Sequence, residues 1–151
     1  FLIYLLIEFL SVYYFFYKTL KQNRLKLLYF FLILFTCLFI FSLLYWSKSN
    51  SLITQGINSV FITVFVFVST FLWFKDVFGD LEIPVLWRNP KFQFIAGFLL
   101  YYSSTLFLYI SSNFIFENKN LIFSDYWFLN ILATFIFRMI LILATWNQLR
   151  K

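Results

Sequence analysis

The stretch Tyr126-Trp-Phe-Leu-Asn-Ile-Leu-Ala-Thr-Phe-Ile-Phe-Arg-Met-Ile-Leu-Ile-Leu-Ala-Thr-Trp146 decides the fold class of this chain. An α-helix rises about 1.5 Å per residue, so about 20 apolar residues cross the hydrocarbon core of a bilayer. Trp127 and Trp146 lie near the two ends of the stretch, where indole rings favour the headgroup region. The pattern predicts a membrane-spanning helix over about 126–146.

Apolar runs of similar length recur along the chain. Of its 151 residues 63% are hydrophobic and 12% are charged, whereas about 25% are charged in an average soluble domain. Four further spans are expected, at about 2–17, 27–46, 52–74 and 92–113. We therefore predict an all-α, polytopic transmembrane helix bundle that forms a single domain over 1–151. The chain begins at Phe1 inside an apolar run, so we also expect sequence before it.

Two charged residues are expected within the membrane. Arg138 lies inside the last span, where an arginine costs about 2.5 kcal/mol or more on insertion scales and should face protein, water or a counter-charge. Glu8 lies inside the first span. Helix rise places Glu8 about 13 Å and Arg138 about 12 Å below the same membrane surface. We therefore predict that Glu8 and Arg138 form an intramembrane charge pair. The alternative is that Glu8 lies near the true end of its helix and faces water.

Polar residues form stripes on the fourth and fifth spans. On the fourth span they are Gly97, Tyr101, Ser104 and Ser111, and on the fifth they are Asn130, Thr134, Arg138 and Thr145. Spacings of three, four and seven place each set on one helical face. We expect the two faces to meet each other or a shared cavity, either as packing between helices or as a path for a ligand or ion.

The second and third spans give weaker signals. The second span has few polar groups, namely Thr36, Cys37 and Ser42, so we expect it at the periphery, facing lipid or a partner protein. The polar residues of the third span are spread around the helix and indicate no single face: Gln55, Asn58, Ser59, Thr63, Ser69 and Thr70. Gly79 is a plausible end of that helix, and Asn89 before Pro90 predicts the start of the next.

The basic residues predict the orientation in the membrane. Nine flank the spans on one side: Lys18, Lys21, Arg24, Lys26, Lys75, Arg88, Lys91, Arg150 and Lys151. The other side has two, Lys48 and Lys119. The side rich in lysine and arginine is normally cytoplasmic, so we expect a cytoplasmic C-terminus and the start of this chain outside. This also accounts for the net charge of +6 without a nucleic-acid partner.

No catalytic or metal-binding pattern is found. The chain has no histidine, and Cys37 is its one cysteine, inside an apolar run. The carboxylates Asp76, Asp80 and Glu82 have no ligand spacing and indicate a solvated interfacial loop. No phosphate-binding loop, nucleophilic serine motif or zinc motif is present. We predict no cofactor and no metal, and consider an enzyme the least supported class of function.

The segment Asp80–Asn113 contains motifs that resemble those of a known protein family. Its elements are Asn89-Pro90, Gly97, Tyr102-Ser103-Ser104 and Ile110-Ser111-Ser112-Asn113, with Ile7-Glu8-Phe9 as an earlier block. With these the chain resembles a family of uncharacterised multi-span membrane proteins of Bacteroidota, some of them fused to histidine kinases. The resemblance implies a seven-span protein, of which five spans are present here, and a role in sensing or signalling. The chain departs from the fused relatives because it ends at Lys151 without kinase motifs.

The function expected from these features is that of an integral subunit of the bacterial inner membrane, sensor-like or accessory. Its partners would be the lipid bilayer and other membrane protein subunits, reached through helix contacts. The alternative is a small-molecule or ion transporter that uses the polar faces of the fourth and fifth spans.

Overall fold

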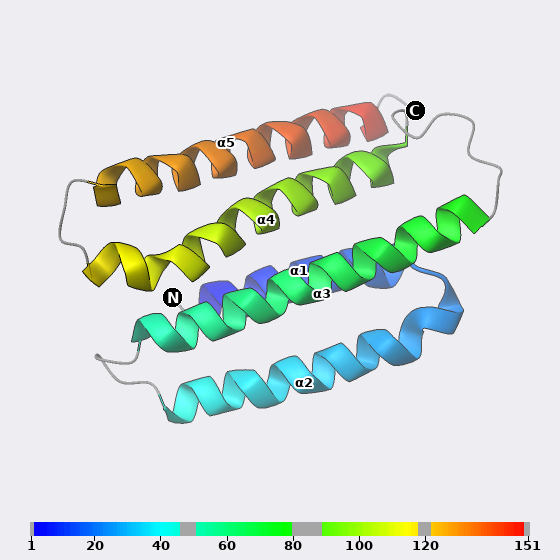
Figure 1. Cartoon of the computed structure of the whole chain (residues 1–151). Coiled ribbons are helices and arrows are strands. Elements are labelled where there is room, and N and C mark those ends of the chain that lie inside the picture. The colour runs from blue at the N-terminus through cyan, green and yellow to red at the C-terminus, as the bar shows by residue number, and fades with distance from the viewer. Residues whose placement is uncertain (1, 46–50, 80–88, 118–121, 150–151) are drawn as a thin grey trace. The chain divides into compact units, whose positions relative to one another are not determined.

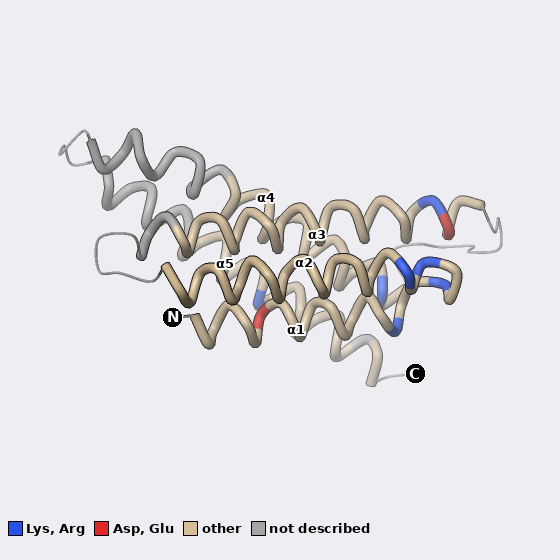
Figure 2. The backbone as a smooth tube through the Cα atoms, turned by 90° about the horizontal axis from the view of Figure 1, so that it is seen from below, with Lys and Arg blue, Asp and Glu red and all other residues tan. Residues whose placement is uncertain are grey.

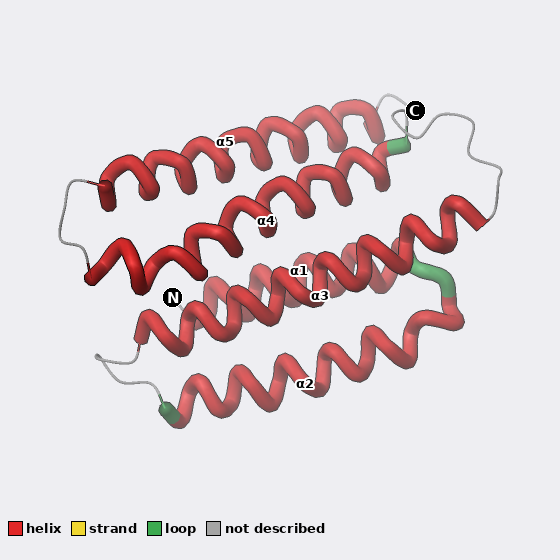
Figure 3. Tube along the Cα trace, in the orientation of Figure 1, coloured by secondary structure: helices red, strands yellow, loops and turns green. Residues whose placement is uncertain are grey.

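A computed structural model describes residues 2–45, 51–79, 89–117 and 122–149, with the side chains of 51–53, 107–117, 122–127, 129–130 and 147 left out. These residues form five α-helices and one short 3₁₀-helix (Figures 1 and 3). They are α1 (Leu2–Thr19), η1 (Gln22–Arg24), α2 (Leu25–Leu44), α3 (Ser51–Gly79), α4 (Pro90–Glu117) and α5 (Ile122–Leu149). The described residues contain no strand, and the prediction of an all-α helical bundle is confirmed.

The helix ends follow the local sequence signals. The Asn89 side chain caps α4, because its Oδ1 atom accepts a hydrogen bond of 3.0 Å from the backbone N–H of Lys91. Helix α3 ends at Gly79, as predicted. Helices α3, α4 and α5 all extend beyond their predicted spans, because both polar and apolar residues next to the spans continue the helices.

Within the described residues, three helices are long and apolar enough to cross a bilayer. These spans are Leu2–Thr19, Gln22–Leu44 and Thr54–Gly79, and α5 adds the shorter apolar stretch Ile131–Trp146. They support a membrane protein in general. The remaining spans and the seven-span protein implied by the resemblance stay predictions.

The chain divides into two compact units, unit 1 over Phe1–Leu81 and unit 2 over Glu82–Lys151, and each is described by itself. The single domain expected over 1–151 stays a prediction. Unit 1 contains α1, α2 and α3, and unit 2 contains α4 and α5.

The core of unit 1 is a cluster of phenylalanine rings around Phe65 of α3. The Phe65 ring centroid lies 5.4 Å from Phe9, 5.9 Å from Phe16 and 5.3 Å from Phe31. Phe9 in turn stacks on Phe35 at 3.8 Å. These rings join all three helices, and Phe9, Phe16, Phe35 and Phe65 are almost fully buried. Aromatic rings in offset or edge-to-face contact stabilise one another beyond the area they bury.

Helix α2 is the least buried span of unit 1. Half of the α3 span (50%) is buried, compared with 22% of α1 and 17% of the span that contains α2. Exposed apolar residues such as Phe30, Ile33, Ile40 and Phe41 cover much of the α2 surface. Within unit 1 this agrees with the peripheral position predicted for the second span.

In unit 2, α4 and α5 run antiparallel and approach each other at Gly97 (Figure 1). A Cβ atom built on Gly97 would lie 3.1 Å from Ile140 Cγ2 and 3.5 Å from the Phe137 ring. The Tyr101 ring stacks on Phe137 with centroids 4.7 Å apart. A residue without a side chain therefore sets how closely the two helices pack.

Gly97→Leu should destabilise unit 2 by about 1–3 kcal/mol, because the added atoms would force Ile140 and Phe137 away from α4. Thermal melting of the purified protein in detergent would measure this. Gly56→Leu is the matched control, since a Cβ atom at Gly56 meets nothing within 4 Å. Equal melting temperatures for the two variants would contradict the close contact.

Candidate functional site

A buried hydrogen-bonded asparagine joins α2 to α3. The Nδ2 atom of Asn58 donates to Ser42 Oγ at 2.7 Å and to the carbonyl oxygen of Thr54 at 2.8 Å. Asn58 is fully buried and Ser42 nearly so. Hydrogen bonds of this kind between membrane helices contribute about 0.6–2 kcal/mol each. The contact fixes the depth at which the two helices meet.

Sequence reasoning missed that most polar residues of α3 are buried. The buried set is Thr54, Asn58, Ser59, Thr63, Ser69 and Thr70. They occupy two neighbouring stripes, 54–58–69 and 59–63–70, which together cover one side of the helix. Within this set, three buried atoms have no hydrogen-bond partner among the described residues, namely Asn58 Oδ1, Ser69 Oγ and Thr70 Oγ1. The steps of four from Thr54 to Asn58 and from Ser59 to Thr63 could have indicated this burial. They were not recognised because the residues of two neighbouring stripes, taken together, look spread around the helix.

The predicted stripe of α4 meets apolar residues. Gly97 and Tyr101 face α5, where they lie against Phe137 and Ile140. The Ser104 hydroxyl donates to the Leu100 carbonyl at 2.8 Å, one turn back in the same helix. The side chain of Ser111 lies outside the described part of the chain.

The predicted stripe of α5 lies partly outside the contact with α4. Arg138 and Thr145 are exposed, and the Thr145 hydroxyl donates to the Leu141 carbonyl at 2.8 Å. Thr134 is partly buried, and the side chain of Asn130 is not among those described. Gly97 and Tyr101 thus contact apolar residues of α5, whereas Arg138 and Thr145 are exposed. A meeting of the two polar faces stays a prediction.

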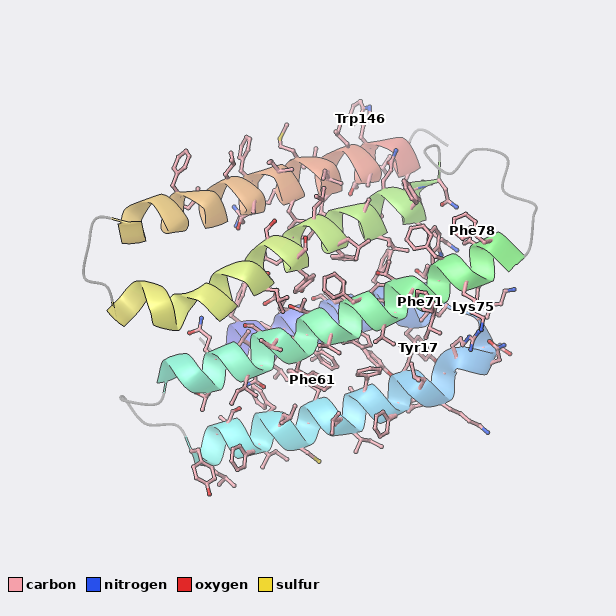
Figure 4. All side chains as sticks on the ribbon, in the orientation of Figure 1. Tyr17, Phe61, Phe71, Lys75, Phe78 and Trp146 are labelled. Atoms are coloured by element: carbon pink, nitrogen blue, oxygen red, sulfur yellow. The ribbon has the colours of Figure 1, made fainter. Side chains whose placement is uncertain are left out.

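Arg138 is surrounded by apolar residues on an exposed face of α5. Ile131, Phe135 and Ile142 share this face at steps of four and three, and each is more than half exposed. Trp146, at the end of the predicted span, also points away from α4 (Figure 4). Arg138 is exposed, so among the described residues of unit 2 none covers it. Glu8, its predicted partner, is partly buried in unit 1, and the pair stays a prediction.

Charged residues gather at one end of unit 1 (Figure 2). The end of α1, the start of α2 and the end of α3 lie there (Figure 2). The charged residues in these segments are Lys18, Lys21, Arg24, Lys26, Lys75 and Asp76. Arg24 Nη2 lies 3.4 Å from Asp76 Oδ1, with the two side chains 28% and 13% exposed. The ion pair joins the segment before α2 to α3. Asp76, expected in a solvated loop, is therefore part of helix α3 and is mostly buried.

Among the described residues no three His, Cys, Asp or Glu side chains gather as a metal site would require. Cys37 is exposed on α2.

No protein-family model, curated protein or solved structure matches this chain. The resemblance to the Bacteroidota membrane family therefore stays an expectation. What the chain does has to be argued from its own exposed and buried polar groups.

Proposed function

We propose that this chain is an integral subunit of a bacterial inner membrane, sensor-like or accessory, that works through helix contacts with partner proteins. The observation that carries the proposal is Arg138 on an exposed, apolar face of α5. The described residues of that face are apolar apart from Arg138 and Thr145. A partner helix with a carboxylate at this depth would cover the face and neutralise its charge.

Two hydroxyl groups of the predicted polar faces support a packing role over transport. Ser104 and Thr145 donate to carbonyl groups of their own helices, so their hydroxyl protons are satisfied locally. A transporter would present such groups to a substrate near the midplane of the membrane. Transport along α4 and α5 stays the alternative.

Photo-crosslinking in native membranes tests the proposal. A photo-reactive phenylalanine analogue at Phe135, which is 60% exposed, should form an adduct of one fixed mass with another membrane protein. The same analogue at Phe137, whose ring stacks on Tyr101, is the matched control and should react within the chain. Adding Arg138→Met should reduce the Phe135 adduct at least fivefold. Adducts with lipid alone, or only with a second copy of the chain, would count against the proposal.

The orientation forms part of the same proposal, with the nine-residue basic side in the cytoplasm. In a Cys37→Ala background, an impermeant thiol reagent added outside should label single cysteines placed at Asn50 and Asn118. Cysteines placed at Arg24 and Asn89 should react only after the membrane is opened. The reverse pattern would overturn the orientation.

A further inference from the structure

We propose that the basic end of unit 1 binds the headgroup of an anionic phospholipid. The basic end is defined by Lys18, Lys21, Arg24, Lys26 and Lys75. Its four lysines are exposed, and Arg24 is partly exposed. They come from three different helix ends, so the fold, and not a run of neighbouring residues, assembles the cluster.

The basic end of unit 1 has a large excess of positive charge. Five basic residues stand against one described carboxylate, Asp76, which gives a net charge of +4. Glu8 lies ten residues before Lys18 on α1, about 15 Å away along the helix, and is too distant to neutralise the cluster. A site with this surplus favours a ligand with one or more phosphate charges.

The ion pair with Asp76 gives the cluster a fixed point. Because Asp76 holds one nitrogen of the Arg24 guanidinium at 3.4 Å, the arginine keeps its place between α2 and α3. Around this anchor, lysine side chains are long and flexible enough to adjust to a headgroup. Figure 4 shows Lys75 at the end of α3 close to the start of α2.

Apolar residues beside the charges indicate a lipid and not a free anion. Lys18 Nζ lies 5.8 Å from the centre of the Tyr14 ring, and Tyr14 and Tyr17 are both exposed on α1. Tyrosine at the end of a span favours the headgroup region, which places the lysines at the depth of lipid phosphates. Leu27 and Phe30 are exposed on the first turns of α2. Acyl chains would lie on these residues while the headgroup meets the lysines.

Lipid retention measured by native mass spectrometry tests this proposal. The protein would be reconstituted in equal amounts of phosphatidylglycerol and phosphatidylcholine, then released with its bound lipids. Each basic residue near an anionic surface strengthens binding about fivefold. The variant with Lys18→Gln, Lys21→Gln and Lys26→Gln should therefore retain at least tenfold less phosphatidylglycerol, and an unchanged amount of phosphatidylcholine. The three lysines are exposed, and the Arg24–Asp76 pair stays intact.

The control variant removes the same charge elsewhere on the predicted cytoplasmic side, through Lys91→Gln, Arg150→Gln and Lys151→Gln. It should retain phosphatidylglycerol as the unmodified protein does. Equal losses in the two variants would overturn the proposal, since net charge alone would then explain binding. Displacement of the lipid by millimolar inorganic phosphate would also overturn it, because the site would then recognise the free anion. In the unmodified protein, retention that does not fall as salt is raised would contradict an electrostatic site.

Discussion

Phe65→Ala should lower the stability of the protein by about 3 kcal/mol, the largest effect expected from a single truncation in unit 1. Phe65 is fully buried and its ring contacts phenylalanines of α1 and α2. Removing the ring would leave a void where three helices meet, and lipid cannot fill it. Thermal melting in detergent measures the loss.

Phe71→Ala is the matched control for this truncation. Phe71 lies on the same helix but is 70% exposed. Its truncation removes contacts with lipid or detergent, and new contacts with lipid or detergent replace them. We expect a change below about 0.5 kcal/mol. If both variants melt at the same temperature, the phenylalanine cluster does not hold unit 1 together.

Glu8→Gln and Arg138→Met should each destabilise the protein by several kcal/mol if the two residues form a buried charge pair. Removing one partner strands the other charge in a medium of low dielectric constant. The double variant should recover part of the loss, because neither charge is then unpaired. A double-mutant cycle in detergent melting gives the coupling energy. Glu8→Gln combined with Thr145→Val is the control cycle and should be additive.

The two outcomes of this cycle have different consequences for α5. Coupling would assign Arg138 to Glu8, and any docking on the exposed face of α5 would then depend on its apolar residues alone. Strict additivity would show that the two residues are independent. Arg138 would then need a partner from outside this chain, as the proposed subunit role requires.

Much of the fold was predictable because hydrophobic length is a strong signal. Apolar runs located all five helices, and Asn89 followed by Pro90 located the start of α4. Which side of each helix is buried was harder to predict. Lipid is as apolar as a protein core, so Phe65 in the core and Phe71 at the surface look alike in the sequence.

The candidate sites were less predictable for a related reason. A polar residue in a span should be shielded from lipid, but the sequence does not show by what. Asn58 is shielded by Ser42, on another helix and sixteen residues earlier, and neither side chain looked decisive alone. The polar face of α5 was expected to meet that of α4 or a shared cavity, but at Gly97 the neighbours on α5 are the apolar residues Phe137 and Ile140, and Arg138 is exposed.

Two polar contacts hold α2 against α3, and their spacing has a mechanical consequence. Arg24 and Ser42 are eighteen residues apart, as are Asn58 and Asp76, which is about five helical turns or 27 Å in each case. Polar contacts with the same separation along each helix thus join the antiparallel pair near both ends. Sliding one helix along the other by a single residue would break both contacts together. A displacement of one end of α3 should therefore move α2 and α3 as one rigid body.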